Sequence, residues 1–125
     1  MKLENKWDIT LAQGDTLIQP IKIKTNFDMT SDDEVLIVVR DKSRKVIFNT
    51  RVKVELESPR VAYVSLIWDV EETEKHDISY NLWDATYYQY KKESDESIVV
   101  KKKILFRNAK FNIVEKQSSE DGVAI

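Results

Sequence analysis

The 125-residue chain contains no cysteine, only two glycines and two prolines, and a single histidine. The absence of cysteine excludes disulfide bonds, thiolate metal sites and cysteine nucleophiles. Because glycine and proline are so few, most turns must be built from Asp, Asn, Ser and Lys. The longest apolar run, residues 35–39, is too short to cross a bilayer, and the N-terminus lacks the apolar core of a signal peptide. We therefore expect a soluble protein, made in the cytoplasm, that has no membrane partner.

Charges of both signs are mixed along the chain, with 20 basic and 22 acidic residues and a net charge of −2. Such a balance creates no large field that would attract nucleic acid, so we expect no nucleic-acid partner. The lysines at 101–103 are typical of an edge strand that avoids unwanted pairing. The length suits one domain, which we place at 1–116. Residues 117–125 carry no pattern and are expected to form a flexible tail.

Short segments of alternating or continuous apolar residues follow one another at a spacing of roughly ten residues. Only residues 70–75, with acids at the start and a lysine at the end, have the composition of a short helical turn. These features predict an all-β fold, an antiparallel β-sandwich of about eight strands with one helical turn near 70–75. A closed barrel is the structural alternative.

The segment 76–85 is predicted to be a central strand, because large side chains alternate along it. Tyr80 and Leu82 lie in one row of this strand, and Trp83 lies in the other. We expect the first row to face the core together with Val64 and Leu66.

Three groups of residues raise the question of catalysis or metal binding. His76 stands beside Asp77, but neither a cysteine nor a serine elbow accompanies the pair. The acids at 28–34 lack the spacing and central glycine of a calcium loop. The glutamates at 71–74 lie on a short turn without a convergent aromatic cleft. We expect no enzyme activity, no metal site and no cofactor.

Aromatic residues gather at 83–90, where tyrosines follow a tryptophan. Such a group resembles a platform on which sugars stack, although cross-strand packing uses the same side chains and is favoured. Several strands are apolar on both faces, which indicates an outer surface that another subunit covers. The expected interface residues are Tyr63, Ile67, Trp83, Tyr87 and Tyr88.

The order of several short motifs matches a known family. In the first half, Gln13-Gly14-Asp15-Thr16 ends a strand, and an apolar strand ending at Arg40 leads through a lysine-rich turn to Val46-Ile47-Phe48. In the second half the motifs are Val61 to Leu66, Glu72-Thr73, Ser79 to Trp83, Ile104-Leu105-Phe106 and Phe111-Asn112-Ile113. From about Trp7 to Glu115, the chain resembles the N-terminal immunoglobulin-like domain of phage baseplate upper proteins.

The resemblance implies an immunoglobulin-like sandwich that serves as a non-enzymatic structural subunit of a tailed phage or of a prophage-derived particle. The expected location is the tail or baseplate of the virion, after synthesis in the host cytoplasm. The expected partners are other tail or baseplate proteins, and a homo-oligomer is a further option. The alternative function is a carbohydrate-binding β-sandwich module with an aromatic stacking platform.

Overall fold

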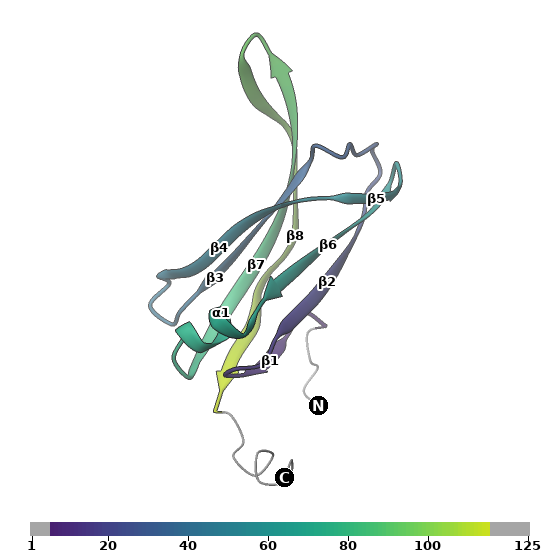
Figure 1. Ribbon diagram of the computed structural model, residues 1–125. Coiled ribbons are helices and arrows are strands. Elements are labelled where there is room, and N and C mark those ends of the chain that lie inside the picture. The colour runs from purple at the N-terminus through teal and green to yellow at the C-terminus, as the bar shows by residue number, and fades with distance from the viewer. Residues whose placement is uncertain (1–5, 116–125) are drawn as a thin grey trace, which may run out of the picture.

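The computed structural model describes residues 6–115, so the tail expected at 117–125 lies outside the described residues. Eight strands and one short helix follow one another along the described chain (Figure 1). Alternating or continuous apolar residues form the strands, and Asp69 begins the helix by accepting a hydrogen bond from the Glu72 amide. The elements are β1 (Ile9–Ala12), β2 (Leu17–Lys24), β3 (Glu34–Arg40), β4 (Val46–Lys53), β5 (Glu55–Ser58), β6 (Val61–Trp68), α1 (Val70–Lys75), β7 (Ser79–Glu93) and β8 (Glu96–Val114).

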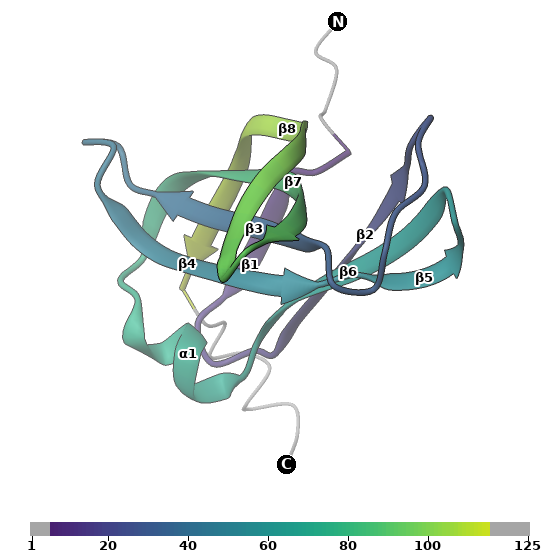
Figure 2. The same ribbon diagram turned by 90° about the horizontal axis from the view of Figure 1, so that it is seen from above.

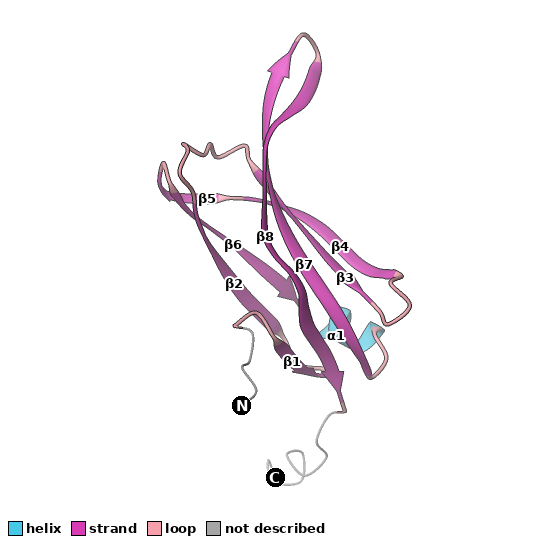
Figure 3. Ribbon diagram, turned by 180° about the vertical axis from the view of Figure 1, so that it is seen from behind, coloured by secondary structure: helices cyan, strands magenta, loops and turns pink. Residues whose placement is uncertain are grey.

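The strands form two sheets, one with the order β1-β8-β7-β3-β4 and the other with the order β2-β6-β5. Figure 2 shows β3 and β4 to one side and β2, β5 and β6 to the other, and Figure 3 shows α1 near one end of the strands. Apart from β1, this arrangement follows the G-F-C-C′ and B-E-D order of immunoglobulin-like sandwiches. The predicted all-β sandwich of eight strands is confirmed, and so is the helical turn near 70–75.

One strand pair differs from the expected antiparallel sandwich. β1 pairs with β8 in parallel, with Ile9 opposite Phe111 and Ala12 opposite Val114. The alternation of a four-residue strand predicts its buried face but not its direction relative to a partner about 100 residues away in the sequence. The parallel pair covers the edge of β8 only near its C-terminal end.

The core lies between the sheets and takes side chains from both. The prediction is confirmed for Val64 and Leu66, which are buried on β6, but it is wrong for Tyr80 and Leu82. These two side chains are 62% and 41% exposed, because β7 buries the opposite row. The largest fully buried side chains are Trp68, Trp83, Tyr87, Phe111, Ile21, Ile23, Ile37, Leu66 and Ile113.

Trp83 fixes the orientation of β7. Its indole N–H donates to the main-chain oxygen of Trp7 over 2.8 Å. Its ring meets Phe106 edge to face, with 4.6 Å between ring centroids, and meets Phe111 at 6.0 Å. Buried aromatic contacts of this kind, with the polar N–H satisfied, hold one side of a strand firmly in the core.

A buried carboxylate closes the end of the sandwich where β3 begins. Asp33 accepts hydrogen bonds from the Thr30 amide at 2.8 Å, from the Gln89 side-chain amide at 3.0 Å and from the Tyr87 hydroxyl. Its main-chain oxygen accepts from the amide of Val54, the residue at which the chain passes from β4 in one sheet to β5 in the other. Burial and the hydrogen bond to Asp33 raise the pKa of the Tyr87 hydroxyl far above its usual value.

Replacing Tyr87 by phenylalanine tests this network. We expect Tyr87→Phe to lower the free energy of unfolding by about 1–3 kcal/mol at pH 7, because the buried Asp33 loses a donor. The raised pKa of Tyr87 keeps its proton in the folded state, whereas an unfolded tyrosine releases it near pH 10. Wild-type stability should therefore fall above about pH 10, and more steeply than in Tyr87→Phe, as measured by urea denaturation at several pH values.

The matched control is Tyr80→Phe, because Tyr80 is largely exposed. An alkaline stability profile that is the same in Tyr87→Phe and in Tyr80→Phe would contradict the role of Tyr87.

Candidate protein-binding face

The outer side of the five-stranded sheet carries a stripe of large side chains. The rows that face away from the core on β3 and β7 lie next to each other, with Leu36 opposite Thr86 and Arg40 opposite Leu82. A hollow of about 1200 Å³ lies over these rows. We call this surface the β3–β7 face, and its apolar and aromatic members are Leu36, Val38, Tyr80, Leu82 and Tyr88.

Basic side chains surround the β3–β7 face. They come from the end of β3, from the turn after it and from β8, which are distant in the sequence. The acidic side chains at the hollow, Asp41 and Asp84, are both engaged within the protein. The basic members of the rim are Arg40, Lys42, Arg44, Lys102, Arg107 and Lys110.

Asp84 and Asp41 hold the backbone around the hollow. Asp84 pairs with Arg40 and accepts the amide of Asn108 at 3.0 Å, and Asn108 has a positive φ of 56° at a shift in the β7–β8 register. Asp41 accepts hydrogen bonds from Ser43, which lower the pKa of its carboxyl group. Both carboxylates are thus used to shape the loops, and positive charge prevails at the rim although the whole chain carries −2.

The tyrosines of the β3–β7 face are in contact with cations. The Lys42 amino group lies 5.2 Å from the ring centroid of Tyr80, and Lys102 lies 5.9 Å from that of Tyr88. Tyr88 also stacks on Tyr90, with 6.3 Å between the centroids. An apolar centre with aromatic anchors and a polar rim is the common composition of a protein–protein interface.

The structure does not bring the predicted interface residues together. Trp83 and Tyr87 are fully buried, so the prediction that they form an exposed interface is wrong. Tyr88 lies on the β3–β7 face, whereas Ile67, which is 61% exposed, and Tyr63 belong to the other sheet. The stacking platform expected of a sugar-binding module also loses Trp83 and Tyr87 as members.

Leu36, Tyr80 and Leu82 are the surface residues that the sequence interpretation missed. The row of Trp83 contains Asn81, which made it look like the solvent side, yet Asn81 is 2% exposed. The signal that could have identified the buried row is the recurrence of Trp83, Ala85 and Tyr87 at every second position.

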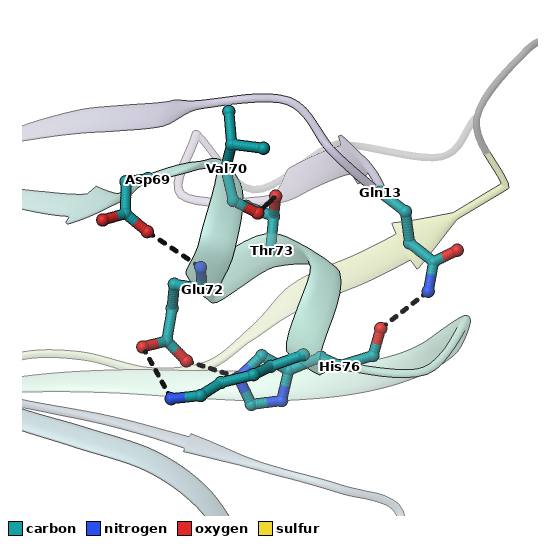
Figure 4. Close-up of polar contacts among 7 residues, drawn as sticks. Gln13, Asp69, Val70, Glu72, Thr73 and His76 are labelled. Atoms are coloured by element: carbon teal, nitrogen blue, oxygen red, sulfur yellow. Dashed lines mark hydrogen bonds and ion pairs between the residues drawn. The ribbon is translucent and has the colours of Figure 1, made fainter.

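The single histidine lies at the corner where α1 meets β7 (Figure 4). Its Nε2 is 2.9 Å from a carboxylate oxygen of Glu72, and its ring stacks on Trp68 with 4.7 Å between centroids. Its main-chain oxygen accepts a hydrogen bond from the side chain of Gln13 at 2.8 Å. The partner of His76 is thus Glu72 on the helix, and these contacts fasten α1 to the end of the sandwich. The expectation that the chain is not an enzyme stays a prediction.

Within residues 6–115, no group of three or more acidic or histidine side chains is placed to hold a metal ion. In the acidic segment at 28–34, Asp28 pairs with Arg60 at 3.3 Å and Asp32 with Lys53 at 3.8 Å, while Asp33 is buried. In the same part of the chain, no helix has the length and apolar character needed to cross a membrane.

Alanine variants of Trp83 and Tyr88 distinguish a core residue from a surface residue. We expect Trp83→Ala to lower the free energy of unfolding by about 3–5 kcal/mol, because it removes a fully buried indole. Tyr88→Ala should cost about 1 kcal/mol at most, because its ring lies on the outer face. Thermal and urea denaturation measure both values, and similar losses for the two variants would contradict the assignment.

In comparisons with protein-family models, with curated proteins and with solved structures, no family, relative or structural neighbour matches this chain.

Proposed function

We propose that the protein is a non-enzymatic structural subunit of a tailed phage, or of a prophage-derived particle, that acts in the tail or baseplate through protein–protein contacts. The observation that carries this proposal is the β3–β7 face, where Tyr80 and Leu82 lie exposed beside the half-buried Leu36 and Tyr88, inside a basic rim. The immunoglobulin-like strand order supports it, because the resemblance of the sequence to baseplate domains implies such a sandwich.

The chemistry of the β3–β7 face indicates what its partner presents. The hollow of about 1200 Å³ exceeds the usual size of a small-molecule pocket, which is roughly 300–1,000 Å³. Its basic rim favours acidic side chains, and its apolar centre favours aliphatic or aromatic ones. A segment of a neighbouring tail protein with acidic and apolar residues meets both requirements. Nucleic acid meets only the first, because the central stripe offers Leu36 and Leu82 in place of phosphate contacts.

The second candidate is a carbohydrate-binding module. The observation that favours it is the stacked pair of Tyr88 and Tyr90 on the outer side of β7. Sugars bind to accessible aromatic rings through their apolar faces. A glycan array that includes a Tyr88→Ala, Tyr90→Ala variant tests this candidate, and glycan binding that depends on the two tyrosines would replace the structural proposal.

The direct test of the proposed function is the presence of the protein in purified tailed particles from the bacterium that encodes it. Mass spectrometry of the particles should detect the chain, and a gold-labelled antibody should mark the tail or baseplate in electron micrographs. A protein that is expressed during particle formation but absent from purified particles would overturn the proposal.

A pair of aspartate variants tests which surface makes the contact. In a strain that lacks the gene, supplied Leu82→Asp should be incorporated into particles at least about tenfold less than wild type, because the charge disrupts the apolar centre of the β3–β7 face. The matched control Ile67→Asp changes an exposed aliphatic residue on the opposite sheet and should be incorporated normally.

Circular dichroism should show that both aspartate variants fold. Loss of Ile67→Asp with normal incorporation of Leu82→Asp would move the contact to the three-stranded sheet.

A further inference from the structure

The β7–β8 hairpin extends beyond the sheets as a two-stranded ribbon (Figure 1). The pairing of β3 with β7 ends at Tyr88, and the pairing of β1 with β8 covers only 111–114. Beyond Tyr88, β7 and β8 pair only with each other up to Glu93 and Glu96. In this stretch, β8 has a free edge on the side away from β7, among the residues that the structure describes.

The free stretch of β8 exposes three consecutive apolar residues. Ile98, Val99 and Val100 are 43%, 48% and 49% exposed, although successive side chains of a strand point to opposite faces. A two-stranded ribbon is only marginally stable in water when no other part of the protein covers either of its faces. A strand added to the free edge would pair its backbone groups and shield these side chains at the same time.

The charged residues on either side of these apolar residues make the segment complementary in charge to an antiparallel copy of itself. Asp95 and Glu96 precede the apolar residues, and Lys101–Lys103 follow them. When two copies of this stretch align in antiparallel fashion about Val99, the acids of each copy come opposite the lysines of the other. A parallel alignment would place lysines opposite lysines, which is unfavourable.

We propose that the free edge of β8 pairs with the same edge of a second copy of this chain, antiparallel and centred on Val99. The contact has two-fold symmetry, so each copy uses the same residues. The two five-stranded sheets then join through their hairpins into one continuous sheet. The pairing leaves the β3–β7 face uncovered at Leu36 and Leu82, so it goes beyond the proposed function and does not depend on it.

The lysines of the hairpin do not block this edge. Lys101 lies over the ring of Phe27 at 5.0 Å, and Lys103 donates to the main-chain oxygen of Lys24 at 2.9 Å. Both side chains thus project from a face of the sheet and do not lie across the backbone edge of β8. On such a face, oppositely charged side chains of neighbouring strands form ion pairs. The register between β7 and β8 shifts at Val100, which makes it an extra residue in β8. With this shift kept, Glu96 of each copy comes opposite Lys103 of the other.

Cysteine substitution tests the register, because the natural chain has no cysteine to interfere. In an antiparallel pair centred on Val99, the two copies of this residue lie about 5 Å apart between Cα atoms, within the range of a disulfide. Val99→Cys should therefore form a disulfide-linked dimer on mild oxidation. The matched control Ser97→Cys should not, because the two copies of Ser97 would lie about 13 Å apart along the strands.

Charge reversal tests the orientation. Asp95→Lys with Glu96→Lys makes every charged residue from 95 to 103 basic, and Lys102→Glu with Lys103→Glu leaves Lys101 as the only basic residue in the same stretch. Each double variant alone should associate about tenfold or more weakly than wild type, whereas an equimolar mixture of the two should form a heterodimer. The control Glu55→Lys with Glu57→Lys makes, on β5, the same change of net charge as the first double variant and should associate like wild type.

Sedimentation velocity over a range from micromolar to millimolar protein measures the association. Association of the wild type, loss in each double variant and recovery in the mixture support the antiparallel pair. A wild type that is monomeric throughout would overturn the proposal, as would a dimer that the double variants leave unchanged. Association that is lost in Leu82→Asp but retained in the hairpin variants would place the contact on the β3–β7 face instead.

Discussion

The orientation of β7 depends on the burial of one indole, that of Trp83. Its N–H is satisfied by Trp7, and its ring is held between Phe106 and Phe111. Because side chains alternate along a strand, this contact also directs Tyr87 inward to Asp33 and Leu82 outward to the solvent. A shift of β7 by one residue would exchange its core side and its outer side. The core and the β3–β7 face are therefore two results of the same constraint.

A sandwich without disulfides needs other means of closing its ends. At one end, the buried carboxylate of Asp33 joins the start of β3 to Tyr87 and to the crossing at Val54. At the other end, Thr73 of α1 accepts a hydrogen bond from the amide of Gly14, which has a positive φ of 86°. Hydrogen bonds between segments distant in the sequence thus do here what a covalent bridge between sheets does in many immunoglobulin domains.

The sequence predicts the elements of this fold better than their orientation. Alternation identified the strands, and the acids and lysine at 70–75 identified the helix, because both signals are local. The buried side of β7 could not be predicted with the same success, since Tyr80 and Leu82 look as apolar as Trp83 and Tyr87. Likewise, the basic rim is invisible in a chain of mixed charge, because Arg44, Lys102 and Lys110 meet only after folding. The Asp33 network was missed for the same reason.

The parallel pairing of β1 with β8 has a mechanical consequence. The chain enters β1 at Ile9 and leaves β8 at Val114, and the two strands run in the same direction. Tension applied to the chain on either side of this pair pulls the strands in opposite directions along their length. Their hydrogen bonds are then loaded together in shear and not opened one after another. The pair of β1 and β8 is thus arranged to resist stretching of the chain.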